Sequence, residues 1–346
     1  MDKPLLTIAI PTYNRASYLD ICLSHICGQL EKGDERVEVL ISDNDSTDNT
    51  SEVINNYIHN SYAINYVRNR EDIGADRNFL QCFNSATGKY VLILGDDDIL
   101  LDGAVGKILD ILEKDNYGVV NLRSYGFVND FISERPKGCG YLKGYDEYND
   151  LDSFLIKVNY FLTFVSVNVI NKSLVNDNLN LERFLETNLV HLGWTFSALF
   201  NSNKNIYVKE YLGAAKLYNS GGYRLCHVFG VNNNKIFDIF VSEYQINKKF
   251  FEIINKKMLL SFFPANIIRS RMNIISVKDE KPYNILFPLY KRYLYFWVFT
   301  FPAIVLPKRM AFFLFSIVDV LRKLLQFFLS LVDYMRAKLF MAKVIK

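Results

Sequence analysis

Residues 90–101 read YVLILGDDDILL, in which a run of apolar residues is followed by one glycine and three consecutive aspartates. The apolar and β-branched residues predict a buried strand, and Gly95 allows a tight bend where that strand ends. Asp96, Asp97 and Asp98 therefore follow the carboxyl end of a strand. In open α/β sheets ligands bind at this edge, so the stretch connects the expected fold with the expected site.

The sequence before this stretch alternates between strand-like and helix-like segments. Apolar, β-branched runs occupy residues 5–11, 37–42 and 63–69, and apolar residues at three-and-four spacing occupy residues 18–30, 51–58 and 78–86. Strands that alternate with helices are typical of right-handed βαβ units. The sequence therefore predicts an α/β fold of the Rossmann-like, nucleotide-binding type with a mostly parallel sheet.

A polar loop follows each predicted strand. The loops are PTYNR (11–15), SDNDSTDNT (42–50), NREDIGADRN (69–78) and GDDD (95–98). Because parallel strands end at one edge of a sheet, we expect these loops to surround one ligand.

Carboxylates in the second loop suit a nucleobase edge or ribose hydroxyls, which are neutral hydrogen-bond donors. The alternative is an Asx-rich turn that caps the next helix, a role that suits Asp48 or Ser46. Asp43 is closest to the end of the strand, so it is the better ligand candidate.

The aspartate triplet requires compensation, because adjacent buried carboxylates repel one another. Mg²⁺ and Mn²⁺ bind carboxylate oxygens and keep positions open for phosphate, so a divalent cation and a diphosphate are predicted here. The alternative is that the aspartates cap the helix predicted to follow them and complement its dipole. Capping accounts for one or two of the three carboxylates, which favours the metal interpretation.

The four segments IAIPTYNR, VLISDNDSTDNT, NREDIGADRNF and YVLILGDDDIL occur in an order that resembles the family 2 glycosyltransferases. These are inverting, metal-dependent enzymes with a GT-A fold that use nucleotide sugars. The segments look most like the bacterial O-antigen branch that includes the abequosyltransferases. The resemblance covers residues 5–125 and extends weakly to about residue 220.

The resemblance implies which residues border a nucleotide-sugar donor, with Asp43 on the base. They are Pro11, Thr12, Tyr13, Arg15, Asp43, Asp45, Gly74, Asp76, Arg77, Asn78 and Asp96. The acidic motif departs from the family form D-x-D-D, because Gly95 stands at the first acidic position. If the last residues of the motif are aligned with those of the family form, Asp97 corresponds to the principal metal ligand, and Asp96 or Asp98 is the second ligand.

A general base is expected near residues 181–194, next to and within an aromatic-rich helix predicted around residues 184–200. The family has an acidic residue at the start of a helix here, and the O-antigen branch has a histidine further along. The candidates are Glu182, Glu186 and His191. The alternative is that the glutamates lie on a solvated helix face and that the imidazole of His191 is half-buried and hydrogen-bonded in the interior. Trp194 either stacks on an acceptor sugar or belongs to the core.

The C-terminal part of the chain is basic and apolar. From Pro282 onward there are ten Lys and Arg residues and two Asp residues. The apolar segment 293–306 is shorter than the roughly 20 residues of a spanning helix. After it, polar side chains recur at three-and-four spacing, and they are Ser316, Asp319, Lys323, Gln326, Ser330 and Asp333. Arg322 and Arg336 lie beside this polar stripe. A helix of this kind fits a membrane interface; the alternative is a core helix or a coiled-coil seam.

The predicted organisation has three parts. Residues 1–230 form the GT-A domain, with a nucleotide-sugar half in 1–120 and an acceptor half in 121–230; residues 231–292 form a helical region, and residues 293–346 form amphipathic helices on the membrane. The five scattered cysteines predict free thiols in a reducing compartment. The first apolar run is too short for a signal peptide, so a cytoplasmic, peripheral position on the inner membrane is expected.

The predicted function is transfer of a sugar from a nucleotide-sugar donor to a lipid-linked acceptor. The resemblance implies an oligosaccharide on undecaprenyl diphosphate, in O-antigen or surface polysaccharide biosynthesis. The residues before Pro282 carry a slightly negative net charge and the basic residues gather in the tail, which argues against a nucleic-acid partner for the whole protein. One alternative is a metal-dependent nucleotidyltransferase, which would carry a glycine- and lysine-rich phosphate loop in place of PTYNR. The other is a catalytically decayed membrane scaffold, against which the intact Asp43 and 96–98 argue. The oligomeric state does not follow from the sequence.

Overall fold

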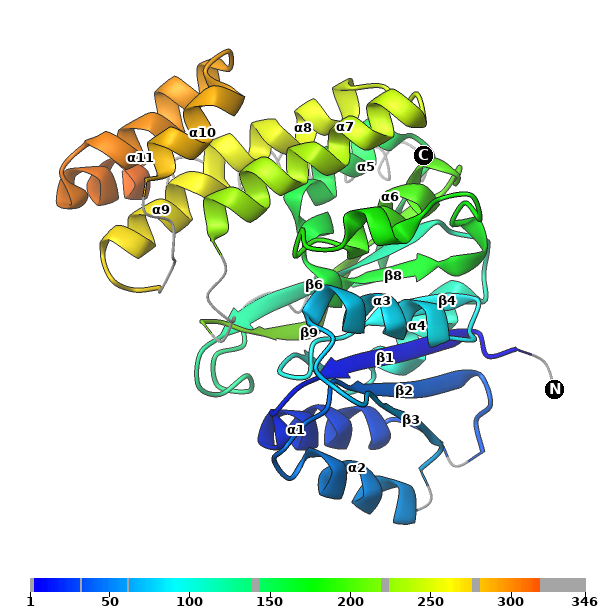
Figure 1. The fold of residues 1–346 in the computed structure, drawn as a ribbon. Helices are drawn as coiled ribbons and strands as arrows, with labels where there is room; N and C mark the ends of the chain where they lie inside the picture. Colours follow the sequence, from blue (N-terminus) through cyan, green and yellow to red (C-terminus); the bar gives the residue numbers. More distant parts are fainter. Residues whose placement is uncertain are drawn as a thin grey trace, which may run out of the picture. The chain divides into compact units, whose positions relative to one another are not determined.

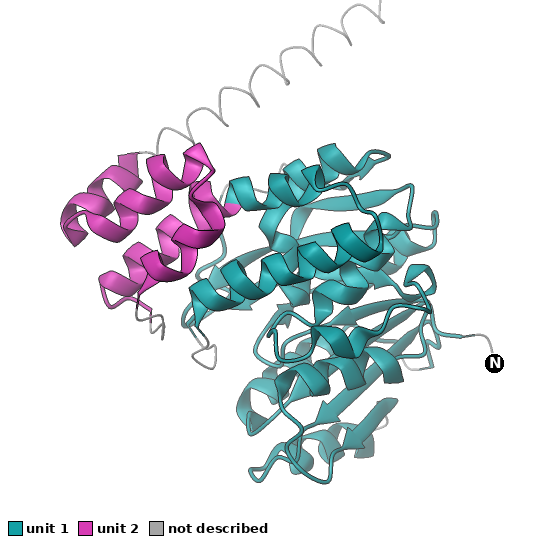
Figure 2. Ribbon diagram, turned by 45° about the horizontal axis from the view of Figure 1, so that its top comes forward, with its two compact units in different colours: residues 1–257 teal, residues 258–346 magenta. Residues whose placement is uncertain are grey.

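The computed structural model describes residues 3–31, 33–60, 62–137, 143–218, 224–275 and 281–317. The chain divides into two compact units, residues 1–257 and residues 258–346, which Figure 2 colours separately. The first unit contains the sheet and all four polar loops, and the second is helical where it is described.

A nine-stranded sheet forms the centre of the first unit. Its strands are β1 (Leu6–Thr12), β2 (Val37–Asp43), β3 (Ile64–Arg68), β4 (Tyr90–Ile93), β5 (Ile99–Leu100), β6 (Val119–Phe127), β7 (Tyr145–Tyr148), β8 (Asn168–Asn171) and β9 (Asn205–Lys216). They are ordered β3-β2-β1-β4-β8-β6-β9-β5, and β7 pairs with β9. The register places Thr12 beside Asp43, and Asp43 beside Arg68, so the first three strands end together.

The prediction of a mostly parallel sheet holds for β3, β2, β1 and β4 but is wrong for the sheet as a whole. In the described residues β8 runs antiparallel to both of its neighbours, β4 and β6, and β9 is antiparallel to β5 and β7 while it is parallel to β6. Apolar periodicity identifies a strand, but it carries no information about the partner or direction of that strand. The sheet is a mixed α/β sheet.

Eight helices of the first unit surround the described part of the sheet. They are α1 (Ala16–Cys27), α2 (Thr50–His59), α3 (Ala75–Ser85), α4 (Ala104–Leu112), α5 (Leu151–Val158), α6 (His191–Phe200), α7 (Asn233–Glu243) and α8 (Lys249–Lys257). Figure 1 shows α1 and α2 beside β1, β2 and β3, and α6 beside β8, with α7 and α8 beyond α6.

Different helices cover the two faces of β1. Leu6, Ile8 and Ile10 share one core with apolar side chains of α1 and α4. The intervening residues Thr7 and Ala9 are also fully buried, and α3 packs against β1 and β2. Alternate residues of one strand thus lie on two covered faces, which explains why the strand reads as a continuous apolar run.

The helix around residues 184–200 begins later than predicted. Residues 181–184 form a short 3₁₀ turn, and α6 starts only at His191. Glu186 and Asn188 have φ angles of 63° and 56°, which a right-handed helix does not allow. Both glutamate candidates therefore lie before α6.

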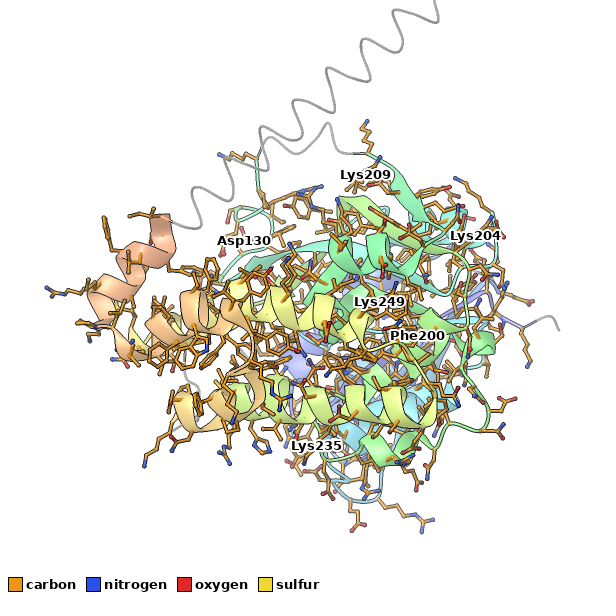
Figure 3. The ribbon with its side chains drawn as sticks, turned by 90° about the horizontal axis from the view of Figure 1, so that it is seen from above. Asp130, Phe200, Lys204, Lys209, Lys235 and Lys249 are labelled. Carbon is orange, nitrogen blue, oxygen red and sulfur yellow. The ribbon has the colours of Figure 1, made fainter. Side chains whose placement is uncertain are left out.

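Trp194 belongs to the core, which is one of the two alternatives that the sequence left open for it. Its ring stacks on Phe83 of α3, with centroids 4.4 Å apart and planes 5° apart, and Trp194 is 1% exposed. On the other side of α6, Phe200 (labelled in Figure 3) contacts Phe240 of α7 and Phe251 of α8. Aromatic packing thus joins α6 to α3, α7 and α8.

The second unit is helical in its described residues. It contains a π-helical turn (Met258–Phe262), α9 (Phe263–Arg271), α10 (Pro282–Tyr290), a second π-helical turn (Phe296–Thr300), α11 (Phe301–Val305) and helical residues 308–317. The Arg271 guanidinium donates to the carbonyl oxygens of Ala303 and Leu306 at 2.6 Å, so it caps α11.

The polar stripe predicted in the tail lies outside the described residues from Asp319 onward. Among the helices that the structure does describe, none is long and apolar enough to cross a membrane. The boundaries at 230 and 292 remain predictions. Cys22, Cys27 and Cys82 are buried free thiols, Cys226 is also buried, and Cys139 lies outside the described residues.

Candidate active site

The first and fourth polar loops meet at the carboxyl edge of the sheet. The Thr12 hydroxyl donates to Asp96 Oδ2 at 2.8 Å, and Arg15 Nη1 donates to Asp96 Oδ1 at 3.0 Å and to Asp97 Oδ2 at 2.8 Å. These partners are more than 80 residues apart in sequence, and parallel pairing of β1 with β4 brings them together. The edge therefore holds several carboxylates beside a guanidinium.

Two of the three aspartates are held at raised pKa. Burial is the main reason that the pKa of Asp96 rises to about 6; the charge of Asp97 adds to the rise, and Arg15 and Thr12 oppose it. Burial and the charge of Asp97 raise the pKa of Asp98 to about 7, although the Lys216 N–H donates to Asp98 Oδ1 at 2.9 Å. Negative charge is costly here, so the edge favours additional positive charge.

The aspartates do not cap the following helix. Between them and α4 lies the short strand β5, and the N-cap of α4 is Gly103, whose φ is 77°. The capping alternative is thus excluded for this triplet.

Gly95 leaves room for the carboxylates that follow it. A Cβ atom at Gly95 would lie 3.1 Å from Asp98 Oδ2 and 3.2 Å from Asp97 Oδ1. The Gly95 N–H also donates to the Ser166 hydroxyl at 3.0 Å. The absence of a side chain at this position therefore allows Asp97 and Asp98 to fold back over the end of the strand.

The donor set at this edge fits a hard cation. It consists of carboxylate oxygens with raised pKa values, which Mg²⁺ or Mn²⁺ would stabilise as charged groups. In the described ranges, however, no three Asp, Glu, His or Cys side chains are already arranged around a common metal position. Of the three aspartates, Asp97 is the most exposed.

The second loop is tied to the first mainly by Asn14, which the sequence interpretation missed. Asn14 Oδ1 accepts hydrogen bonds from the N–H of Thr47 at 2.7 Å, and the Asn14 N–H donates to the Ser46 hydroxyl at 2.9 Å. Asn14 has a φ of 53°. An asparagine in a strand-ending loop is a common signal for this left-handed conformation, so it could have been identified from PTYNR.

Asp48 makes the Asx turn expected before α2, whereas the N-cap residue of α2 is Asn49, which makes no side-chain cap hydrogen bond. Asp48 Oδ2 accepts the N–H of Ala16 at 3.0 Å, and Asp48 Oδ1 accepts the N–H of Thr50 at 3.1 Å. Burial raises the pKa of Asp48, but these hydrogen bonds outweigh that effect and lower it overall. One carboxylate thus stabilises the first turns of both α1 and α2.

Asp43 is fully buried at the end of β2. Its Oδ1 accepts the N–H of Ser46 at 2.9 Å and its Oδ2 accepts the Tyr66 hydroxyl at 2.9 Å. Asp45 has a φ of 65° and pairs with Arg68 at 3.3 Å. Pro11 and Thr12 are buried, whereas Tyr13 is 44% exposed and is available to a planar ligand.

The third loop begins α3 and is fastened to β2. Gly74 has a φ of 82°, which favours glycine, and it is the N-cap of α3. Asn78 is buried and donates to the Ser42 carbonyl at 3.1 Å, while the Ser42 hydroxyl donates back to Asn78 Oδ1 at 2.6 Å. Arg77 is exposed. Asn78 thus lies in the interior, where it fixes α3 on the sheet.

Asp76 turns toward the segment 186–190. The Asn188 N–H donates to Asp76 Oδ2 at 2.9 Å, and the N–H groups of Glu186, Thr187 and Val190 also interact with this carboxylate. Burial raises the pKa of Asp76, and these N–H groups partly oppose the rise. The contact brings the second half of the domain to the N-terminal end of α3.

The three base candidates lie in different environments. His191 is buried, and its Nε2–H donates to the Thr163 carbonyl at 3.0 Å, because a carbonyl can only accept. Burial lowers the pKa of His191 to about 4. Glu182 lines a hollow of about 350 Å³ with Phe83 and Asn84 of the last turn of α3. Glu186 is exposed beside the first turn of α3.

Comparison with known proteins agrees with this geometry. The model of the family described as Glycosyl transferase family 2 matches residues 7–166. Abequosyltransferase RfbV of Salmonella typhimurium is 45% identical over 97 residues, 28% of this chain and 29% of the relative. A Campylobacter jejuni protein named GalNAc(5)-diNAcBac-PP-undecaprenol beta-1,3-glucosyltransferase is 31% identical over 34% of this chain and 37% of the relative. The chain therefore spans about a third of the length of these two curated relatives.

Among solved structures, S. aureus TarS 1-349 in complex with UDP-GlcNAc has a TM-score of 0.60 and 16% sequence identity, over 83% of this chain and 82% of that one. At this identity the similarity concerns the fold, which is a mixed α/β sheet consistent with the GT-A fold. The family match contains all four polar loops and the carboxylate edge that they form. Residues 7–166, the part of the chain that builds this edge, are therefore similar to glycosyl transferase family 2.

Proposed function

We propose that this protein is a glycosyltransferase that moves a sugar from a nucleotide-sugar donor to the hydroxyl group of a lipid-linked acceptor. The observation that carries the proposal is the contact of Thr12 and Arg15 with Asp96 and Asp97 at the carboxyl edge of β1 and β4. In an α/β sheet this edge is the position of a bound nucleotide. A family 2 domain around this edge supports sugar transfer over nucleotidyl transfer.

The donor would lie over the first three loops. Exposed Tyr13 offers a ring on which a base can stack, and Asp43 and Asp45 supply carboxylates at the end of β2. Arg15 and the exposed Arg77 are the cations available to a diphosphate, and Gly74 allows the backbone to come close to it.

A divalent cation would be held by Asp97, with Asp96 or Asp98 as the second ligand. When bound, such a cation neutralises charge on a departing diphosphate as a Lewis acid. The raised pKa values of Asp96 and Asp98 support this assignment, because carboxyl groups that resist ionisation gain most from an added positive charge.

Glu186 is the proposed general base. In the transfer step, the acceptor oxygen attacks the anomeric carbon and its proton passes to the Glu186 carboxylate. The bond from that carbon to the diphosphate breaks, and the nucleoside diphosphate leaves with the electron pair. A single displacement of this kind inverts the anomeric centre.

The other two candidates are less suited to this role. The lowered pKa of His191 makes it a weak base, and its Nε2 is already used by Thr163. Glu182 lies near the last turn of α3, whereas Glu186 lies near Asp76 in the first turn. These two turns are about 10 Å apart, because a helix rises 1.5 Å per residue.

The second unit supports a lipid-linked acceptor and a peripheral position on the inner membrane. Its described residues expose large apolar side chains, and these are Ile274, Tyr283, Leu294, Trp297, Val298, Val305, Met310, Phe312, Phe313, Leu314 and Ile317. Lys291, Arg292, Lys308 and Arg309 are exposed on the same unit. Apolar side chains with basic neighbours suit an anionic lipid surface. The Campylobacter relative, by its name, acts on an undecaprenol-linked saccharide.

The test is a screen of nucleotide sugars with Mn²⁺ and a lipid-linked saccharide, read by the release of nucleoside diphosphate. We expect release from one class of donor, loss of release with EDTA, and at least a 100-fold loss in Asp97→Ala. Asp110→Asn removes an exposed carboxylate on α4 and serves as the matched control. Full activity in EDTA or in Asp97→Ala would overturn the metal assignment. Transfer of the nucleotide rather than the sugar would overturn the proposed reaction.

A further inference from the structure

The contact between Asp76 and the segment 186–190 joins two parts of the domain that are far apart in sequence. Asp76 is the second residue of α3, and Asn188, which donates its N–H to Asp76 Oδ2, follows 112 residues later. The N–H groups of Glu186, Thr187 and Val190 are near enough to the same carboxylate to oppose the rise in its pKa that burial causes. Asp76 therefore accepts a backbone donor that no helix or strand satisfies and faces the N–H groups around it.

The segment needs this support because its backbone is strained. Glu186 and Asn188 both lie in the left-handed region, with φ of 63° and 56°. Non-glycine residues rarely adopt this conformation, and it persists only where surrounding contacts enforce it. On the opposite side, Asn232 Nδ2 donates to the Thr187 carbonyl at 3.1 Å. The segment is thus held between Asp76 and Asn232.

Asp76 is itself fixed relative to the sheet. Two residues further along α3, Asn78 exchanges two buried hydrogen bonds with Ser42, the residue before Asp43 in β2. A continuous set of contacts therefore leads from the end of β2, through the first turn of α3, to the segment that carries Glu186. A change at any of these contacts would move Glu186 relative to the carboxylate edge.

We propose that Asp76 is a positioning residue that locks the strained segment 186–190 and thereby places Glu186 at the acceptor hydroxyl. This inference rests on the proposed function, in which Glu186 takes the proton. Asp76 then acts through Glu186 and makes no direct contact with the donor, unlike the role that the sequence resemblance implied. The carboxylate is needed because the Asn188 N–H donates to it and the neighbouring N–H groups stabilise its charge, which an acceptor-only side chain allows.

The first test is Asp76→Asn in the full chain. Its amide places one donor against the N–H groups, so the segment should shift. We expect kcat for transfer to fall about 100-fold, since a displacement of about 1 Å has an effect of this size. The donor KM and the slow hydrolysis of donor without acceptor should change less than threefold. Amides 186–190 should exchange with deuterium at least tenfold faster than in the unchanged protein.

The second test restores the segment by another route. Glycine adopts positive φ without strain, so Asn188→Gly in the Asp76→Asn background should recover about tenfold of the lost kcat. Asp76→Glu keeps the charge on a longer side chain, so its kcat should lie between that of Asp76→Asn and that of the unchanged protein. Asp110→Asn on α4 is the control for loss of a carboxylate.

The outcomes separate the inference from the proposed function. If Asp76→Asn raises the donor KM and abolishes donor hydrolysis, Asp76 contacts the donor and the inference is wrong. Unchanged kcat or unchanged exchange in 186–190 also overturns it. If Asp76→Asn fails to fold, Asn232→Ala is used instead, because it removes the hydrogen bond to the Thr187 carbonyl on the other side of the segment. An unchanged kcat in Asn232→Ala would also overturn the inference. If the unchanged protein releases no diphosphate from any nucleotide sugar, the proposed function fails instead.

Discussion

Arg15 Nη1 lies 2.8 Å from Asp97 Oδ2, so the proposed principal metal ligand is already paired with a cation of the protein. The same nitrogen lies 3.0 Å from Asp96 Oδ1. Arg15 is only partly exposed, and the charges of Asp96 and Asp97 raise its pKa against the opposing effect of burial, which is the largest single influence. Under the proposed function, Arg15 would compete with a metal ion for these carboxylates until the diphosphate of the donor accepts its hydrogen bonds.

Arg15→Ala should bind Mn²⁺ more tightly and react more slowly. Removal of a positive charge near the carboxylates favours another cation, by about tenfold in Kd, which titration calorimetry of the donor-free protein measures. The loss of a bidentate partner for the diphosphate should lower kcat/KM for the donor by at least tenfold. Weaker Mn²⁺ binding in this variant would show that Arg15 does not compete with the metal.

Gly95→Ala should disturb the carboxylate edge. The new Cβ would lie 3.1 Å from Asp98 Oδ2 and 3.2 Å from Asp97 Oδ1, so the carboxylates must move. We expect a free energy of unfolding lower by about 1–2 kcal/mol and transfer activity lower by at least tenfold.

Gly106→Ala is the matched control for this change. Gly106 lies within α4, and a Cβ there meets nothing within 4 Å. Alanine is the better helix former, so this variant should be more stable by about 1 kcal/mol with unchanged activity. Urea unfolding and diphosphate release measure both variants. Equal behaviour of the two would mean that space at Gly95 is unimportant.

His191 should make the stability of the first unit depend on pH. Burial lowers the pKa of its imidazole to about 4, below the value of about 6.5 for an unfolded chain. The unfolded state therefore binds more protons between these values, and stability is complete above pH 6.5 and falls as the pH drops toward 4. The loss is on the order of 3 kcal/mol.

His191→Gln should reduce this pH dependence, because glutamine does not titrate and can still donate to the Thr163 carbonyl. Urea unfolding at pH 7 and pH 5 measures the difference. His59→Gln, which changes an exposed histidine on α2, is the control. A pH dependence that is the same in His191→Gln as in the unchanged chain would refute the role of the buried imidazole.

The exposed apolar residues of the second unit should mediate lipid binding. Leu294, Val298 and Phe313 are 71%, 52% and 64% exposed, so their replacement by serine should leave the fold intact. We expect the triple variant to lose at least tenfold in partitioning to vesicles that contain anionic lipid, as measured by sedimentation.

Ile132→Ser is the control for that measurement, because Ile132 is 71% exposed on the first unit. It should sediment with vesicles as the unchanged protein does. If the triple variant does so as well, the described part of the second unit is not the lipid-binding surface.

Local patterns in the sequence determined the first half of the sheet and the loops around the site. Strand periodicity placed β1 to β4, and the turn residues after them placed the polar loops at one edge. These features are local, because apolar spacing reports which faces of a strand or helix are buried. The Asx turn of Asp48 is also a local feature, since its Oδ1 partner is Thr50.

Only the tertiary structure decided which distant residues meet. It set the antiparallel course of β8, the start of α6 at His191, the burial of Trp194 against Phe83 and the contact of Asp76 with Asn188. Each depends on partners that are far apart along the chain, and a sequence pattern specifies only that a group needs a partner. The sequence thus determined which chemical groups stand at the edge of the sheet. Packing of α3 and α6 decided which polar side chains near that edge are buried against a partner, because a buried polar group pairs with the donor or acceptor that the fold brings within reach.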